Sequence, residues 1–153
     1  MRLVTSGILT HTVANGTTNT LDDVEQSIAA LRSGPALAEA DLLVLHPNTW
    51  SAMRRTKDSY GRYLVTPDPT SDEANSLWRV EVLPTTQIAA GAGLLLDTRK
   101  FGFVVVREAV SLRTGANDDD FTRNLQRWIA EERLELAVER PSAVLSISGL
   151  PTS

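Results

Sequence analysis

A run of four consecutive apolar residues, Leu42 to Leu45, constrains the fold of this chain more than any other feature. A short, uninterrupted apolar run is typical of a strand that is covered on both faces. Before this run, residues 21–31 carry apolar side chains at helical spacing and end at Gly34-Pro35. After it, Pro47 can open a second helix that extends to about residue 55. The sequence therefore predicts a helix, a buried strand and another helix in succession.

The rest of the chain predicts mainly strands. Apolar and β-branched residues favour strands at 77–83, 94–96, 101–106, 110–113 and 143–148. Asn15-Gly16 favours a tight turn in a short hairpin that joins residues 10–13 to 17–19. We expect strands 42–45, 77–83 and 101–106 to share one sheet flanked by the two helices. Residues 121–139 fit both a helical and a two-residue period, so their composition alone leaves helix and strand open.

The composition excludes several classes of function. The chain of 153 residues has no cysteine, which excludes disulfides, thiol nucleophiles and Cys-ligated metals. Its two histidines, His11 and His46, lack metal-ligand spacing, and no nucleotide-binding or nucleophile motif is present. We expect no metal, no cofactor and no enzymatic activity. The net charge of −4 argues against specific nucleic acid binding, and no apolar run is long enough to span a membrane.

Several segments form an ordered set of motifs. They are Ser6-Gly7-Ile8-Leu9, residues 42–50 (LLVLHPNTW), residues 57–64 (KDSYGRYL), residues 77–84 (LWRVEVLP) and residues 121–143, with Phe121, Asn124, Glu131-Glu132-Arg133 and Arg140-Pro141. In this order and spacing they resemble the tailed-phage major capsid protein family of the Hong Kong 97 type, over nearly the whole chain. Two positions depart from the pattern, because Arg79 stands where the family usually has glycine and His46 where asparagine is common.

The resemblance implies an α+β fold. It corresponds to the axial domain of a Hong Kong 97-like capsid protein, a central mixed sheet flanked by helices, followed by C-terminal strands of the peripheral domain. The expected bounds are residues 1–115 for the axial part and 116–153 for the peripheral part. The resemblance favours a strand for residues 124–139, although without its sheet partners that region could become helical. The family's N-terminal arm, extended loop and spine helix have no counterpart here, which implies a cloned fragment, a truncated prophage product or a reduced relative.

The function implied by the resemblance is structural. The chain would be a major capsid protein, or a fragment or truncated prophage version of one, that forms pentamers and hexamers and meets other phage head proteins. Its location would be the virion and, during assembly, the cytoplasm of the bacterial host. An alternative from another class is a stand-alone α+β binding module of prophage origin, with a small ligand or host-protein partner. A capsid subunit should associate, whereas a binding module should be a stable monomer with a saturable pocket.

One polar stretch is a candidate contact site. It runs from Asp58 to about residue 76 and is interrupted by Gly61, Pro67 and Pro69. A loop of this length in a compact domain is usually functional or mobile, so a merely flexible loop is the alternative to a contact site. The resemblance equates the stretch with the axial loop of the family. We expect residues 58–69 to contact a neighbouring subunit. Arg62 and Tyr63 are the expected contact side chains, because Arg and Tyr are enriched at interface centres.

A chemical activity is also implied, because some members of the family form Lys–Asn isopeptide cross-links assisted by a glutamate. By resemblance, Asn124 falls at the acceptor position and Glu131 at the assisting position. The donor lysine of the family lies in the extended loop, which has no counterpart here. The alternative is structural, with Asn124 as a hydrogen-bonding residue of a turn or of a strand start. Glu131 or Glu132 would then pair with Arg133 or Arg140.

Overall fold

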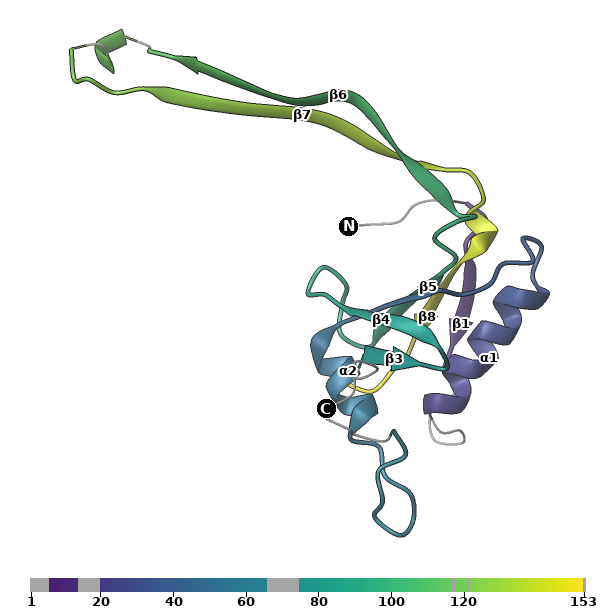
Figure 1. Cartoon of the computed structure of the whole chain (residues 1–153). Coiled ribbons are helices and arrows are strands. Elements are labelled where there is room, and N and C mark those ends of the chain that lie inside the picture. The colour runs from purple at the N-terminus through teal and green to yellow at the C-terminus, as the bar shows by residue number, and fades with distance from the viewer. Residues whose placement is uncertain (1–5, 14–19, 66–74, 117, 121, 153) are drawn as a thin grey trace. The chain divides into compact units, whose positions relative to one another are not determined.

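The computed structural model describes residues 6–13, 20–65, 75–116, 118–120 and 122–152. The chain forms two compact units, residues 1–101 together with 139–153, and residues 102–138 (Figure 1). In chain order the elements are β1 (Leu9–Thr12), α1 (Thr20–Ser33), β2 (Leu42–Leu45), α2 (Pro47–Arg54), β3 (Ser76–Leu77), β4 (Val80–Pro84), β5 (Ala92–Leu96), β6 (Gly102–Gly115), η2 (Asp118–Asp120), β7 (Arg127–Val138), η3 (Pro141–Ala143) and β8 (Val144–Ser148). The second unit contains β6, η2 and β7.

The first unit is built on a six-stranded mixed sheet in the order β1-β8-β5-β2-β4-β3. β1 runs parallel to β8 and β2 parallel to β4, whereas β5 is antiparallel to both of its neighbours, β2 and β8. The register places Leu43, Leu95 and Leu145 next to one another across the sheet. All three are almost completely buried, so they form the centre of the core.

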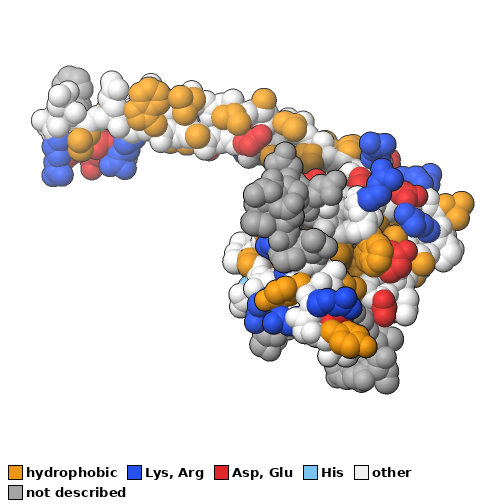
Figure 2. Space-filling model, turned by 60° about the horizontal axis from the view of Figure 1, so that its bottom comes forward, with side chains coloured by type: hydrophobic (Ala, Val, Ile, Leu, Met, Phe, Trp, Pro, Cys, Tyr) orange, Lys and Arg blue, Asp and Glu red, His pale blue; other side chains and the backbone are white. Residues whose placement is uncertain are grey.

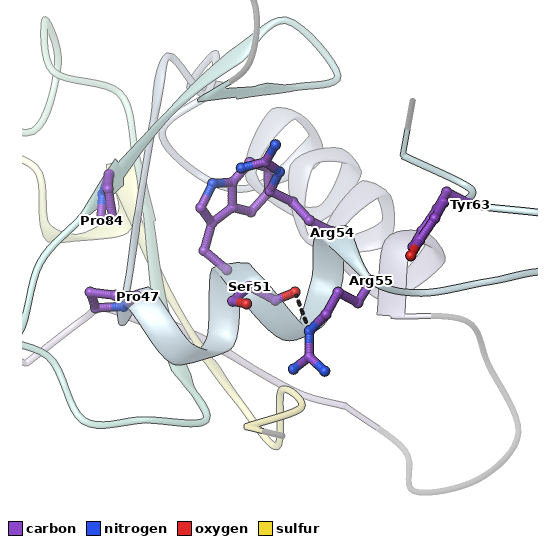
Figure 3. Close-up of a pocket in the computed structure, with 7 residues that line it drawn as sticks. Pro47, Ser51, Arg54, Arg55, Tyr63 and Pro84 are labelled. Carbon is purple, nitrogen blue, oxygen red and sulfur yellow. Dashed lines mark hydrogen bonds between the residues drawn. The ribbon is translucent and has the colours of Figure 1, made fainter. Parts of the chain in front are cut away.

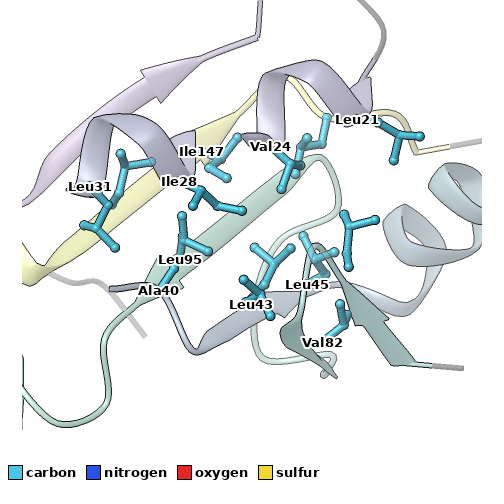
Figure 4. Close-up of a cluster of buried hydrophobic side chains, with 14 of the residues drawn as sticks. Leu21, Val24, Ile28, Leu31, Ala40, Leu43, Leu45, Val82, Leu95 and Ile147 are labelled. Atoms are coloured by element: carbon cyan, nitrogen blue, oxygen red, sulfur yellow. The ribbon is translucent and has the colours of Figure 1, made fainter. Parts of the chain in front are cut away.

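Both helices pack on the sheet face that carries these leucines (Figure 4). Ile28 and Leu31 of α1 join the same buried cluster as Trp50 and Met53 of α2. Local chemistry sets where α2 starts. His46 is its N-cap and accepts a hydrogen bond from the Asn48 N–H at Nδ1, at 3.1 Å. Proline at the first position of the helix lacks only an N–H that would have no partner within the helix.

Much of the predicted element order is confirmed. The predicted helices at 21–31 and 47–55 are α1 and α2, and the strands at 42–45, 94–96 and 143–148 are β2, β5 and β8. Residues 127–138 form strand β7, as the resemblance indicated, and not a helix. The mixed sheet with its two helices confirms the α+β class.

The prediction of one strand at 77–83 is wrong, because the chain reverses at Trp78-Arg79. β3 and β4 are antiparallel, and Leu77 pairs directly with Val80. Trp78 and Arg79 adopt φ angles of +52° and +65°. Positive φ at both central residues is the geometry of a type I′ hairpin turn, which strongly favours Asn-Gly and similar pairs. Arg79 therefore occupies a left-handed position at which glycine would carry no strain.

The predicted strands at 101–106 and 110–113 are parts of a single strand, β6. Its pairing with β7 shifts register between Val106 and Glu108 and again between Glu108 and Ser111, so bulges carry the strand through its polar middle. Because β6 pairs with β7 in a separate two-stranded sheet, the prediction that residues 101–106 share a sheet with 42–45 and 77–83 is wrong. The other two segments do lie in one sheet.

Two further expectations concern the N-terminal third. The predicted hairpin around Asn15-Gly16 lies largely outside the described residues, and within them β1 pairs with β8. The bounds of the compact units differ from the expected division at residues 115 and 116, because β6 pairs with β7 while β8 returns to the first sheet. The assignment of axial and peripheral parts stays a prediction. Within the described segments, none of the helices is both long and apolar enough to cross a membrane.

We expect Arg79→Gly to stabilise the first unit by about 1 kcal/mol, because it relieves a left-handed conformation that a side chain with a Cβ disfavours. Arg79→Ala is the matched control, since it removes the charge and keeps the Cβ. Chemical denaturation of both variants measures the effect. If alanine stabilised the unit as much as glycine, the cause would be the arginine side chain and not the backbone.

Candidate subunit-contact surfaces

The loop after α2 is organised by the carboxylate of Asp58. Its Oδ1 accepts hydrogen bonds from the backbone N–H groups of Tyr60 and Arg62, at 2.9 and 2.8 Å. Its Oδ2 accepts from Nε of Arg62 at 2.8 Å. The backbone closes the same turn, since the Asp58 N–H donates to the Arg62 carbonyl and Gly61 adopts φ +80°. Residues 58–62 thus form a tight, internally bonded turn.

The pKa of Asp58 reflects this network. The backbone hydrogen bond from Arg62 lowers the pKa most, partial desolvation opposes it, and the Arg62 side chain and Tyr60 N–H lower it further. The net direction is downward from 3.8. The carboxylate is therefore ionised at neutral pH and holds the turn together through charge-assisted hydrogen bonds.

Aromatic and basic side chains surround this turn. The Arg62 guanidinium lies 5.4 Å from the centre of the Tyr60 ring, and Lys57 Nζ lies 4.7 Å from that of Tyr63. Tyr60 is 84% exposed and Tyr63 is 48% exposed. The predicted contact residues Arg62 and Tyr63 therefore lie at the surface beside a third candidate, Tyr60, which the sequence reasoning missed. Pro67 and Pro69 of the predicted site lie outside the described residues.

A groove of about 590 Å³ lies along α2 and extends to Tyr63 (Figure 3). Its remaining lining residues are Pro47, Trp50, Ser51, Arg54, Arg55 and Pro84. Two features fix its walls: the Arg54 guanidinium lies 6.0 Å from the centre of the Trp50 ring, and Nε of Arg55 donates to the Ser51 carbonyl at 3.3 Å. Tyr63 lines the groove and directly follows the Asp58 turn, so the groove and the turn form one continuous aromatic and basic surface.

The two-stranded ribbon of β6 and β7 has one strongly apolar face. Residues that pair across an antiparallel ribbon lie on the same face. Val104 pairs with Leu136, Val106 with Leu134, Leu112 with Ala130 and Thr114 with Trp128. We call this set the apolar face. Trp128 is 62% exposed, and its apolar neighbours along the ribbon are exposed as well (Figure 2). Exposed apolar area of this extent is typical of a surface that another polypeptide covers.

The opposite ribbon face is more polar. It carries an ion pair between Arg133 Nε and Glu108 Oε2 at 3.3 Å, and Glu131 pairs in register with Ser111. The predicted cross-linking residues are thus placed in different segments. Glu131 lies within β7, whereas Asn124 lies in the turn before β7, with φ +54°. Their proposed chemical roles stay predictions, and the turn conformation of Asn124 fits the structural alternative.

The acidic run Asp118-Asp119-Asp120 forms the short helix η2 beside this turn. Asp120 is buried and forms an ion pair with Arg127, and Arg123 Nη2 lies 3.7 Å from Asp119 Oδ2. The carboxylates of Asp119 and Asp120 therefore contact arginines of their own unit. In the described part of the chain, acidic and histidine side chains do not gather in groups of three or more suited to a metal ion.

Several solved structures share the fold of this chain. A virus-like particle protein from Pyrococcus furiosus matches with a TM-score of 0.67 at 17% identity, over 95% of this chain and 58% of that chain. The capsid of a native GTA particle matches with a TM-score of 0.66 at 19% identity, over 97% of this chain and 48% of that chain. The SrpI encapsulin of Synechococcus elongatus PCC 7942 matches with a TM-score of 0.59 at 17% identity, over 99% of this chain and 56% of that chain. The fold of this chain is thus the one found in these three proteins.

The sequence comparison is more specific. The model of the phage capsid family matches residues 4–149, and the chain belongs to that family. The major capsid protein of Enterobacteria phage HK97 is 32% identical over 104 residues, which are 67% of this chain and 27% of that protein. The chain therefore spans about a quarter of the length of this curated relative. It is a structural protein, a major capsid protein or a part of one, and this membership favours the capsid hypothesis over the stand-alone binding module.

We expect Asp58→Asn to loosen the turn, because a neutral amide cannot replace the ionised acceptor of three hydrogen bonds. Amide hydrogen exchange at Tyr60 and Arg62 should rise about fivefold. Asp22→Asn, on the exposed side of α1, is the control and should leave both rates unchanged. Equal exchange rates in Asp58→Asn and the wild type would contradict the role of Asp58.

The pH dependence of this turn follows from the lowered pKa of Asp58. A group whose folded-state pKa lies below its unfolded value contributes its stability above the unfolded value, here 3.8. That contribution is lost as the pH falls below 3.8 and through the lower folded-state pKa. A titration of the Asp58 carboxyl by NMR checks the sign, and a midpoint above 3.8 would contradict it.

Proposed function

We propose that this chain functions as a shell subunit, or as part of one, and that its copies assemble into pentamers and hexamers. The observation that carries the proposal is the family match over residues 4–149. Support comes from the fold it shares with proteins of shell-like particles. In this role the chain would meet other phage head proteins, and it would be found in the virion and, during assembly, in the host cytoplasm.

The surface formed by the Asp58 turn and the groove along α2 is the proposed contact between neighbouring copies. Closed rings form through heterologous contacts, in which two different patches of each subunit meet. The exposed Tyr60, and Tyr63 at the end of the groove, are of the residue type enriched at interface centres. Asp58 holds the turn in one conformation before binding, which lowers the entropy lost on association.

In such a subunit the two compact units would have different roles. The first unit, with its sheet and helices, would be the axial part that gathers around the symmetry axes. The ribbon, with its exposed apolar face, would be part of the peripheral region that other shell polypeptide covers. Because the chain spans 27% of the HK97 capsid protein, that relative has ample further sequence to supply such a cover.

Association of the chain tests this proposal. Sedimentation velocity over micromolar to millimolar concentration, with electron microscopy of the largest species, should reveal rings of five or six copies. The double variant Arg62→Ala/Tyr63→Ala should weaken association about tenfold or more, as expected for interface anchors. Arg99→Ala, an exposed arginine of the same unit outside the proposed contact, should associate like the wild type.

Two results would contradict the proposal. One is a monomer at all concentrations. The other is the same mass distribution for the double variant and for the wild type, which would move the contact away from the Asp58 turn.

A further inference from the structure

A single carboxylate interrupts the apolar face of the ribbon. Side chains of a regular strand alternate between its two faces, so Trp128, Ala130, Glu132, Leu134 and Leu136 point to the same side. Four of these are apolar, and Glu132 is the middle one of the five. Its neighbours Glu131 and Arg133 point to the opposite face, where Arg133 meets Glu108.

The two residues of the partner strand that lie opposite Glu132 carry no charge, and the arginine Arg107 of that strand lies in the neighbouring bulge. Arg133 pairs with Glu108 and Glu131 with Ser111, so Glu132 lies opposite the bulged segment Ala109-Val110. Val110 is 65% exposed, and Glu132 is exposed too. Among the described residues, no ion pair engages Glu132 within the ribbon. It is therefore a solvated charge in an apolar strip.

Covering this face with a partner raises the free-energy cost of keeping Glu132 ionised. An apolar partner would remove the carboxylate from water, and a desolvated charge is costly unless an opposite charge pairs with it. Two copies of the apolar face stacked on each other would bring two carboxylates together, with no basic side chain among Val104, Val106, Leu112 and their cross-strand partners. Glu132 therefore disfavours stacking of identical ribbons and favours an occupant that brings a cation.

We propose that the apolar face binds an amphipathic segment of shell polypeptide that carries a lysine or arginine within its apolar stripe, opposite Glu132. Glu132 is then the residue that determines which segment docks and in which register. The apolar side chains supply affinity, and the single charge pair supplies specificity, as electrostatic complementarity does at many interfaces. This inference rests on the proposed function and names the chemistry of the partner that covers the ribbon.

Synthetic peptides test the proposal directly. Three amphipathic helical peptides share one leucine stripe and neutral polar residues elsewhere, and they differ only at the central stripe position, which is Lys, Leu or Glu. The chain with Trp78→Phe is titrated with each peptide. It keeps Trp50, which is buried in the first unit, and Trp128, so a change in fluorescence on binding reports on Trp128 within the apolar face. The lysine peptide should bind about tenfold more tightly than the glutamate peptide, a ratio typical of a partly desolvated charge pair.

Substitutions at the neighbouring residues Glu132 and Glu131 test which face of the ribbon selects the lysine peptide. Glu132→Gln should reduce the ratio to about one, because the charge that selects lysine is gone. Glu131→Gln removes the same charge from the opposite face and should leave the ratio unchanged. Both side chains are exposed, so circular dichroism should show the same fold for both variants. Glu132→Leu should also make the chain associate with itself, as measured by light scattering, because the apolar face becomes continuous.

The proposal is overturned if the three peptides bind equally, if none binds, or if Glu131→Gln changes the ratio as much as Glu132→Gln. These results are independent of ring formation. A chain that forms rings but shows no peptide preference keeps its proposed function and loses this inference. A chain that selects the lysine peptide but forms no rings keeps the peptide preference of the ribbon and loses the proposed function.

Discussion

The pairing of β5 with β8 determines the layout of the chain. Leu96 ends β5 and pairs with Val144, the first residue of β8, so the chain must leave the sheet and return to the same place. The N–H groups of Glu139 and Arg140 donate to the Phe101 carbonyl, at 2.9 and 3.1 Å, and hold the outgoing and returning segments together. The intervening residues can satisfy their backbone groups by pairing with each other, and an antiparallel ribbon does so.

This arrangement also explains why the two units bury their side chains so differently. In the sheet of the first unit, α1 and α2 cover the face around Leu43 and Leu95, so the strands close a core. Within the described residues the ribbon has two strands, and a two-stranded sheet cannot cover its own faces. Its apolar side chains are therefore exposed in this chain by itself. The ribbon carries the residue pattern of a buried sheet without the cover, which is the physical basis for regarding it as an interface.

The sequence predicted best the elements whose signals are local and strong. The apolar run Leu42 to Leu45 and the helical spacing of residues 21–31 both correspond to observed elements. The β3–β4 turn was missed because Trp78-Arg79 lacks the glycine or asparagine that marks a type I′ turn, so the segment read as one alternating strand. The sequence prediction divided β6 into two strands because the charged residues Arg107 and Glu108 interrupt the apolar pattern, whereas the observed strand continues through them by way of bulges.

For the candidate sites, too, the sequence indicated residue types but not the contacts that give them their roles. Arg62 and Tyr63 could be chosen by residue type, but the role of Asp58 depends on hydrogen bonds that only the folded turn reveals. An aspartate shortly before Tyr60 and Gly61 was the available signal, because aspartate often bonds to the N–H two residues on in turns. For Glu132 the signal was visible as a break in the two-residue period of residues 128–138. The sequence could not show which face of the strand Glu132 interrupts. The pairing of β7 with β6 shows that it is the exposed apolar face.

The two proposed contact surfaces rest on different physical interactions, and this difference has a consequence for assembly. The surface at the Asp58 turn is aromatic and basic, and exposed charges act over a distance of about 10 Å that salt shortens. The apolar face of the ribbon gains from burial, which depends on area and has no preferred register of its own. A single charge within such a face fixes the register of the partner, which apolar burial alone does not. If the partner moved by one residue along a strand, its cation would be separated from Glu132. A shell subunit needs both properties, since its contacts must hold and must also repeat with the same geometry in every copy.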